Sequence, residues 1–478
     1  MKVLASEELS EISDASMRIL SETGIVIGSE TALGALAKIG ARIDSNSNKA
    51  FIPAEVVKGA IDSAPKRITL CSRDGKRDVK LFDRDTPALA TDGIGVKLLE
   101  QKTNSHRRST SRDLFRLAIL ADYLNEVDIF WPMVVAADVS ESEHTVKEFA
   151  ISVLGTSKHV QHEAGGRLEA RSEIEIAQVV AGGKENLRKR PPFSAVQCPV
   201  SPLKLERDSA EAAVEFSRSG IPVAGMSITQ MGSTVPATLA ATLAVANAEI
   251  LSALVLSQAA MKESPFIYAI SSAPIDIRSS GEFLAGSPEL ALISAAGAQL
   301  AESYGLPSLV AGMTTDARYP SQQASFEKLQ TGLIPALAGA SIVSGIGGLD
   351  TDNVISFEQM VIDSDIWSDI RRIVRGIEID ADKIQLRTIM EKGAGADFKD
   401  DIDTLKTFNK EVWLPRLPLR HSYSAWKASG GKTVEEMAGE VVKEVLEKHS
   451  PPAVDKDIER DIMVIYKKYQ KELQGERL

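Results

Sequence analysis

The chain has 478 residues, of which 44% are hydrophobic, and a formal net charge of −11. This length can bury a substantial core, and an acidic chain without a basic stripe argues against a nucleic-acid partner. No uncharged apolar run reaches the length of about 18 residues that a membrane span needs, and the N-terminus lacks the apolar core of a signal peptide. Two isolated cysteines, Cys71 and Cys198, give no disulfide framework, so we expect a cytoplasmic protein.

The N-terminal quarter is predicted to be a cap built from short helices and a β-layer. Apolar residues at helical spacing, bounded by serine, proline and glycine, predict helices over residues 6–24, 29–40 and 53–64. Short apolar runs separated by turns over 68–99 predict a β-layer. We place this cap at residues 1–125.

From about residue 126 extended apolar segments alternate with helical patterns. The extended segments lie at 128–139, 159–164, 193–200, 223–229, 266–271, 308–314 and 341–345. An eighth unit is expected near 356–379. Strands that alternate with helices of this length are typical of a parallel sheet, and eight units favour a (β/α)₈ TIM barrel over an open sheet. We assign this α/β barrel to residues 126–380.

The last hundred residues are charged and helical in pattern. Residues 433–448 and 454–474 read as exposed amphipathic helices with paired glutamate and lysine, separated by Pro451-Pro452. We expect residues 381–478 to form a C-terminal helical extension.

The order of short motifs along the chain resembles the trimethylamine methyltransferase family, in particular its members without pyrrolysine. The matching motifs run from residue 19 to the C-terminus: ILSETG at 19–24, SAPK at 63–66, SRDG at 72–75, TSKHV at 156–160, PVSPL at 199–203, ANAE at 246–249, AGSPE at 285–289, FEQ at 357–359 and WLPRL at 413–417. The segment 393–398 and Ser344 depart from the family pattern.

The resemblance implies a barrel enzyme that moves a methyl group from an N-methylated amine to the cobalt of a separate corrinoid protein. Cobalamin would then be carried by that partner, with no cofactor held permanently by this chain. Members without pyrrolysine are associated with quaternary amines such as glycine betaine, carnitine, γ-butyrobetaine and proline betaine. Arg318 lies in the region where we would look for the replacement of pyrrolysine.

The chemistry of a quaternary ammonium limits what the barrel must supply. The departing amine leaves neutral, so no general acid is required, and the protein must desolvate a fixed cation and aim one methyl outward. Carboxylates and aromatic faces suit this task. Asp92 and Asp316, each at the end of an apolar strand, are our candidate catalytic carboxylates. Either could instead be a turn or cap residue bonded to its own backbone.

Seven further residues are candidates for substrate binding. Arg318, followed by Tyr319 and Gln322, could grip a substrate carboxylate through two parallel hydrogen bonds, and a surface salt bridge is the alternative. The others are placed by their position on or near strands, with core packing as the alternative for the aromatic ones: Tyr268, Trp131, Phe357 and His162, the last sharing a strand end with Glu163.

We expect no metal ligand set on this chain. His159 and His162 are three apart on a strand and therefore point to opposite faces. The glycine cluster at 345–348 is weak evidence for phosphate binding and fits the close approach of another surface better.

Other readings remain open. A family member could demethylate a tertiary amine or another N-methyl compound, and a barrel of this kind could be a lyase for a small anion or a betaine-binding protein without turnover. A symmetric homo-oligomer is a general expectation for such an enzyme.

Overall fold

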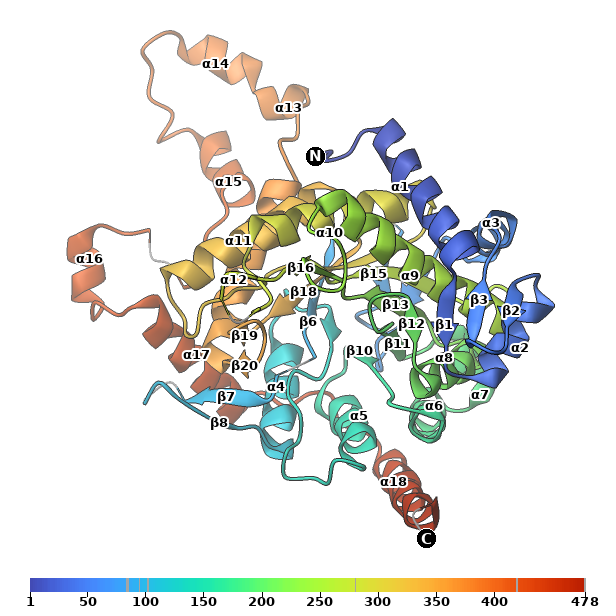
Figure 1. Cartoon of the computed structure of the whole chain (residues 1–478). Coiled ribbons are helices and arrows are strands. Elements are labelled where there is room, and N and C mark those ends of the chain that lie inside the picture. Colours follow the sequence, from blue (N-terminus) through green and yellow to red (C-terminus); the bar gives the residue numbers. More distant parts are fainter. Residues whose placement is uncertain (83–85, 94, 101–102, 280, 418–419, 477–478) are drawn as a thin grey trace.

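The computed structural model describes residues 1–82, 86–93, 95–100, 103–279, 281–417 and 420–476. At its centre is a closed barrel of eight parallel strands, which confirms the predicted (β/α)₈ class (Figure 1). In order around the barrel the strands are β6 (Ala88–Thr91), β9 (Ile129–Phe130), β10 (His159–His162), β11 (Phe193–Gln197), β13 (Val223–Ser227), β15 (Phe266–Ile270), β17 (Ser308–Ala311) and β18 (Ile342–Ile346). The barrel closes where β18 pairs with β6.

Two expectations about the barrel need correction. Its first strand is β6, which the sequence pattern placed in the N-terminal cap, so the barrel begins well before residue 126. Residues 356–379 supply no strand, because Ser356 caps the helix α12 (Phe357–Val374). The eighth strand therefore comes from the start of the barrel sequence. We place the barrel domain from β6 to α12.

Eight helices surround the strands (Figure 1). They are α4 (Ser111–Tyr123), α5 (His144–Gly155), α6 (Arg167–Ala181), α8 (Arg207–Ser219), α9 (Leu239–Ala260), α10 (Pro288–Ser303), α11 (Gln322–Leu337) and α12, with the short α7 (Lys184–Lys189) beside α6. Five of them, α4, α9, α10, α11 and α12, start at a serine or threonine whose side chain accepts a backbone N–H of the first turn. These caps satisfy donors that the helix itself leaves unpaired.

Side chains of the barrel strands alternate between two separate apolar clusters. The interior cluster includes Ala90, Ile129, Ala224 and Ile267, whereas alternate residues such as Tyr268 pack outward against the helices. The hairpin of β4 (Thr69–Leu70) and β5 (Val79–Lys80) adds apolar side chains to the interior cluster. Because the N-terminal ends of the strands meet this hairpin, the other end is the one that stays open.

Smaller sheets and turns lie outside the barrel. A four-stranded sheet joins β12 (Lys204–Leu205) to β1 (Ile25–Ile27), β3 (Lys49–Phe51) and β2 (Arg42–Asp44), next to α1 (Ser6–Arg18), a π-helical turn (Ile19–Thr23), α2 (Glu30–Lys38) and α3 (Ala54–Ser63). A second sheet contains β19 (Gly348–Leu349), β20 (Val354–Ile355), β7 (Lys97–Glu100) and β8 (Ser105–Arg108), and β14 (Gln230–Met231) pairs with β16 (Ala273–Pro274).

Helix α9 is the one described helix whose length and apolar character would allow it to cross a membrane, and 72% of its most apolar window is buried inside the fold. It packs on α1, α3, α8 and two barrel strands, which is typical of a core helix.

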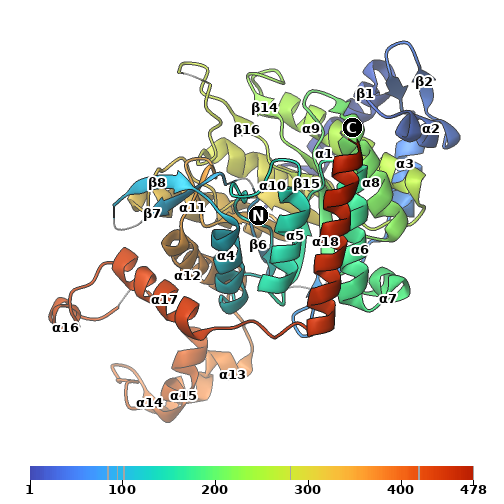
Figure 2. The same cartoon turned by 90° about the horizontal axis from the view of Figure 1, so that it is seen from below.

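The C-terminal helices take two different courses. Helix α17 (Val434–Lys448) packs on α12 and α4, and α18 (Lys456–Glu476) packs on α6 and α5. Between α12 and α17, however, α13 (Ala381–Ile384), α14 (Leu386–Lys392), α15 (Ile402–Glu411) and α16 (Tyr423–Ala428) project away from the barrel (Figures 1 and 2).

Candidate functional site

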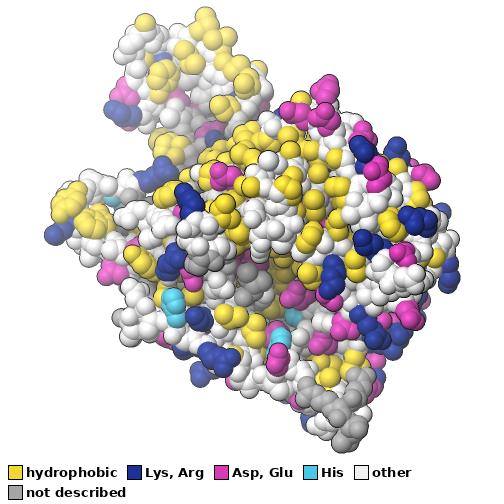
Figure 3. All heavy atoms as spheres, viewed as in Figure 1, with side chains coloured by type: hydrophobic (Ala, Val, Ile, Leu, Met, Phe, Trp, Pro, Cys, Tyr) yellow, Lys and Arg dark blue, Asp and Glu magenta, His cyan; other side chains and the backbone are white. Residues whose placement is uncertain are grey.

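The open end of the barrel is the face turned toward the viewer in Figures 1 and 3, and its centre is hollowed. β14 and β16, which follow barrel strands β13 and β15, lie on this side in Figure 2. Ile228, just beyond the interior side chains of β13, is 37% exposed although it follows a buried strand. In barrels of this class the carboxyl ends of the strands carry the active site. We name this end the mouth.

Asp92 follows β6 at the mouth, and the local backbone brings it beside Trp131. The Thr91 hydroxyl donates to Trp131 O and accepts from Trp131 N, both at 2.6 Å, which ties the ends of β6 and β9 together. A Cβ on Gly93 would lie 2.2 Å from Trp131 Nε1, so only glycine lets the indole approach this closely. The sequence placed both Asp92 and Trp131 in the site, and the structure brings them together.

The carboxyl of Asp92 is in an unfavourable place for a negative charge. Burial raises its pKa to about 6, and the nearby Glu163 pushes it in the same direction, while the backbone N–H of Gly93 and Lys328 act against the rise. Asp92 Oδ1 accepts the Gly93 N–H at 2.7 Å. The turn-cap role that the sequence left open is therefore real, and it uses one of the two carboxylate oxygens.

Glu163 is the second carboxylate of the mouth. It lies just beyond β10, on the same face as His159 and Gln161, since Val160 and His162 face the helices. Its pKa is raised by burial, and it contributes with Asp92 to the raised pKa of the Cys198 thiol. The amide of Gln161 is buried without a hydrogen-bond partner.

Asp352 is a third acidic group, which was not among the candidates predicted from the sequence. Its side chain is 4% exposed, and its Oδ1 has no hydrogen-bond partner. Burial raises the pKa of Asp352 well above its usual value, and the charge of Asp92 adds to the rise. The close approach expected at the glycine cluster is found here, because a Cβ on Gly348 would lie 1.7 Å from Asp352 Oδ1.

The backbone around Asp352 is unusual as well. Asp350, Thr351 and Asp352 all have positive φ angles, of 50°, 57° and 62°. Side-chain-bearing residues in this region cost free energy and cluster at functional sites. Three acidic or polar residues in a row after a glycine cluster were the signal that could have pointed to this turn.

A buried ion pair lies behind these carboxylates. Lys328 Nζ is 2.9 Å from Asp363 Oδ2, and both side chains are fully buried. The ammonium also donates to Met313 O at 2.5 Å and to Gly345 O at 3.1 Å, at the ends of β17 and β18. Lys328 thereby fixes two strand ends and supplies a positive potential that lowers the pKa values of Asp92 and Asp352.

Asp316 and Arg318 lie together in a cleft of about 530 Å³. Thr351 Oγ1 donates to Asp316 Oδ1 at 3.3 Å, and Asp316 contributes to the electrostatic environment of Asp352. Arg318 is mostly exposed, donates to Asp316 O at 2.8 Å, and lies 3.4 Å from Asp350 Oδ1. The salt-bridge alternative for Arg318 is therefore present in the structure, although its guanidinium still faces the cleft.

Tyr319 and Gln322 do not join Arg318. They line a different surface groove of about 580 Å³ together with Phe326 and Val434.

Three other expected ligands are not in the mouth, and these expectations are corrected. Tyr268 points outward and donates to Asn247 Oδ1 on α9 at 3.0 Å. His162 points outward to Glu173 on α6 at 2.8 Å. Phe357 is buried at the start of α12, with the Arg116 guanidinium 5.1 Å from its ring centre. All three side chains instead pack within the protein outside the mouth, which was the alternative to substrate binding.

No group of three His, Cys, Asp or Glu side chains is arranged to hold a metal ion within the described part of the chain. His159 faces the interior, where its ring nitrogens lie 2.9 Å from Cys71 O and 3.1 Å from Ser194 Oγ. Burial lowers the pKa of His159 to about 4, so its ring is neutral at physiological pH.

Comparison with known proteins agrees with this geometry. The family model described as trimethylamine methyltransferase (MTTB) matches residues 1–473. The chain belongs to the trimethylamine methyltransferase family. It is 33% identical to the trimethylamine methyltransferase MttB of Methanosarcina barkeri over 99% of this chain and 96% of that protein. It is 28% identical to the glycine betaine methyltransferase of Desulfitobacterium hafniense over 98% of both chains.

The fold has a solved counterpart in the monomethylamine methyltransferase MtmB of Methanosarcina barkeri. The TM-score is 0.51 at 12% identity, and the match covers 98% of this chain and 86% of that one. This likeness supports the barrel fold alone. As a member of this family the chain is a methyltransferase. In barrels of this class the active site lies at the carboxyl ends of the strands, which here form the mouth.

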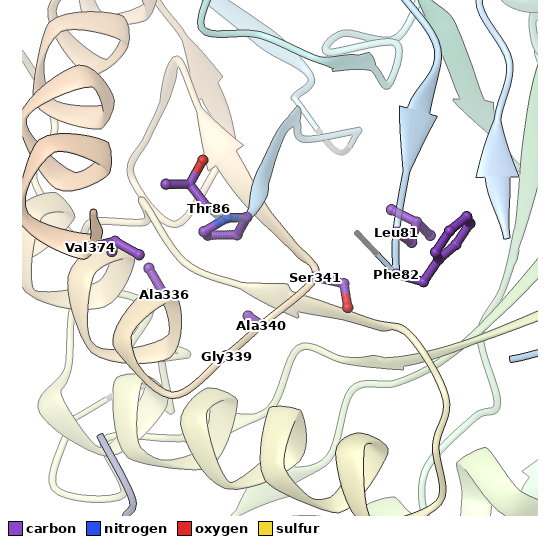
Figure 4. Close-up of a pocket in the computed structure, with 9 residues that line it drawn as sticks. Leu81, Phe82, Thr86, Ala336, Gly339, Ala340, Ser341 and Val374 are labelled. Carbon is purple, nitrogen blue, oxygen red and sulfur yellow. The ribbon is translucent and has the colours of Figure 1, made fainter. Parts of the chain in front are cut away.

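A cavity at the opposite end of the barrel is a poor place for that chemistry. It has a volume of about 170 Å³ and is lined by residues that precede β6 and β18 and by the end of α12, including Pro87, Ser341 and Val374 (Figure 4). Among the described residues that line it there is no charged side chain. We assign no function to it.

Proposed function

We propose that this methyltransferase removes a methyl group from a quaternary amine of the betaine type and passes it to the reduced corrinoid of a partner protein. One observation carries the proposal. Two carboxylates, Asp92 and Glu163, and the indole of Trp131 lie on interior positions at the open end of the barrel, where Glu163 is exposed and Asp92 is partly exposed.

The residues of the mouth suit a permanently charged ammonium. An ionised Asp92 attracts a cation electrostatically, and its partial burial leaves less water to screen this attraction than at the protein surface. The cation in turn favours the ionised carboxylate, which reverses the rise in the pKa of Asp92. Trp131 offers a face for cation–π attraction, about 2 kcal/mol for a desolvated ammonium.

The orientation of the substrate follows from the second cleft. Asp352 is close enough to both Asp92 and Asp316 for their charges to raise its pKa. Arg318 lines the same cleft as Asp316. A betaine with its ammonium near Asp92 would direct its carboxylate toward Arg318, which can bind it in a bidentate manner. The similarity to a glycine betaine methyltransferase favours a substrate of this type.

Methyl transfer then depends on positioning. The partner's corrinoid would supply the nucleophile, so the chain's own residues bind the ammonium, exclude water around it and point one methyl out of the mouth. Holding the two reactants in line accounts for much of the rate advantage of such a reaction. We expect this to take place in the cytoplasm.

A direct assay tests the proposal. The purified chain is mixed with a reduced corrinoid protein and, in separate reactions, glycine betaine, carnitine, γ-butyrobetaine, proline betaine or trimethylamine, and methylation is followed by absorbance. We expect turnover with at least one betaine and a loss of at least about 100-fold, equal to ~2.7 kcal/mol, in Asp92→Ala. Arg318→Ala should raise KM for a betaine but not for a quaternary amine without a carboxylate.

Arg171→Ala is the matched control, because Arg171 is an exposed arginine on α6 that pairs with Glu215 and not with a residue of the mouth. Turnover of trimethylamine alone would overturn the betaine assignment. Full activity in both Asp92→Ala and Arg318→Ala would remove the proposed site.

A further inference from the structure

The segment that follows α12 exposes an unusual amount of apolar surface. We name residues 377–414 the arm; it contains α13, α14 and α15 and projects from the barrel in Figures 1 and 2. None of these three helices has a buried residue. Of the 27 large apolar side chains that are exposed in the described chain, the arm holds eleven: Ile377, Ile379, Ile384, Leu386, Ile389, Met390, Ile402, Leu405, Phe408, Val412 and Leu414.

These apolar side chains follow the spacing of a helix. In α14, Leu386, Ile389 and Met390 share one face, and in α15, Ile402 and Leu405 are three residues apart with Phe408 three further on. Such stripes normally pack against another element. Here they face solvent: Met390 is 72% exposed and Ile402 is 66% exposed.

The arm also lacks the means to hold its helices on its own. Helix α14 has 7 residues and α15 has 10, whereas isolated helices below about 12–15 residues are marginal in water. Helices this short need a permanent cover, and a partner that binds only briefly would leave them unfolded most of the time.

The charges of the arm do not call for a charged partner. Five of its six basic side chains are paired with carboxylates of the arm itself: Lys383 with Glu411, Arg387 with Glu391, Lys392 with Asp401, Lys399 with Asp397 and Lys406 with Asp403. The attraction that remains is the burial of apolar surface, which is typical of permanent interfaces between identical chains.

The position of the arm separates it from the methyl-transfer face. Val374, at the end of α12, lines the cavity at the N-terminal end of the barrel strands, and the arm begins three residues later. In Figure 2 the arm lies on the side opposite to β14 and β16. A small protein that receives a methyl group at the mouth could not contact the arm at the same time.

We propose that the arm docks on a second copy of this chain and holds a homo-oligomer together at the end opposite the mouth. Every copy carries the same arm, so a symmetric assembly covers all of them. The exposed apolar area of the eleven side chains is on the order of 1,000 Å², comparable with the about 800 Å² that one partner contributes to a standard interface. The mouths stay free in such an assembly.

Sedimentation velocity of the full chain at about 10 μM tests this inference. The arm variant Met390→Ser/Leu405→Ser/Phe408→Ser removes three exposed apolar side chains of the arm. Its matched control, Ile39→Ser/Leu292→Ser/Val464→Ser, removes three exposed apolar side chains elsewhere. We expect an oligomer for the unmodified chain and the control, and a dissociation constant at least 100-fold weaker for the arm variant.

A second variant replaces residues 378–410 with three glycines. The two ends of this segment are already held together, because the Arg372 guanidinium donates to Gly376 O at 2.9 Å and to Glu411 O at 3.1 Å. Circular dichroism checks that both arm variants remain folded. A monomeric unmodified chain, or arm variants that keep the assembly, would overturn the inference. An unchanged assembly with lost binding of the corrinoid protein would assign the arm to that partner instead.

Discussion

Polar side chains occur both in the layer between strands and helices and in the mouth of the barrel. The two regions differ in whether these side chains have hydrogen-bond or ion-pair partners. Between the strands and the helices each of these groups has a partner: His162 pairs with Glu173, whose second oxygen has none, Tyr268 pairs with Asn247, and the Lys158 ammonium donates to Ala121 O and Leu124 O at 2.6 Å. In the mouth, acids face acids. Glu163 adds to the raised pKa of Asp92, Asp92 adds to the raised pKa of Asp352, and Asp352 Oδ1 has no partner.

The difference teaches how to separate structure from function in a barrel rich in polar side chains. A paired group stabilises the fold, and its loss lowers the free energy of unfolding. An unpaired carboxyl in an open site costs stability, and such groups are candidates for binding and catalysis. The variants below change one region at a time.

The largest effect is expected at the ion pair that supports the mouth. Lys328→Met leaves Asp363 buried without its cation, and breaking a buried pair in this way lowers the free energy of unfolding by about 3–5 kcal/mol. Urea denaturation measures this loss. The double variant Lys328→Met/Asp363→Leu should recover most of it, because no charge is then left alone. A loss below about 1 kcal/mol in the single variant would show that the pair does not hold the strand ends.

Asp92→Asn should separate activity from stability. Removing the carboxylate lowers kcat/KM for a quaternary amine by at least about 100-fold, equal to ~2.7 kcal/mol. The same change should raise the free energy of unfolding at pH 7 by roughly 1–3 kcal/mol, since a pKa raised to about 6 means that the charge costs stability. Glu173→Gln is the control in the paired region, and its turnover should be unchanged. A stability loss in Asp92→Asn would contradict the comparison.

The pH dependence follows from the same shift. Because the pKa of Asp92 is raised to about 6, kcat/KM for a cationic substrate should rise as pH increases through about 6 and fall by about tenfold per unit below it. The folded chain holds a proton between pH 3.8 and about 6 that the unfolded chain has released. Stability therefore falls as pH rises through this window. Both dependences should weaken in Asp92→Asn, as pH–rate profiles and thermal unfolding would reveal.

Trp131→Leu should have a smaller effect, confined to binding. Loss of the indole face removes about 2 kcal/mol of attraction for a desolvated ammonium, which is about 30-fold in affinity. Isothermal titration with the preferred betaine measures the change. Trp426→Leu, at a half-buried tryptophan on α16, is the control. Equal affinities for the betaine in Trp131→Leu and the unmodified chain would argue against an indole in the cation site.

The sequence predicted the fold better than the site, for a physical reason. The alternation of apolar strands and helices follows from burial on both faces of a parallel sheet, so the barrel could be predicted. The closing strand β6 was misplaced because a long excursion through β7 and β8 separates it from α4. Asp92 and Trp131 could be placed because strand ends meet at one edge of a barrel. Asp352 was missed because its position depends on a left-handed turn, which strand and helix periodicity do not signal; only the run of polar residues after the glycine cluster pointed to it.

The smallest effect is expected at Tyr268, where the sequence left two orientations open. A strand fixes which side chains share a face but not which face is inside, and the structure directs Tyr268 outward to Asn247. Tyr268→Phe keeps the ring and removes one buried hydrogen bond, so the free energy of unfolding should fall by about 1 kcal/mol. KM and kcat should stay unchanged. A clear rise in KM relative to the unmodified chain would indicate that Tyr268 belongs to the substrate site. The division between the mouth and the layer between strands and helices would then be wrong at this residue.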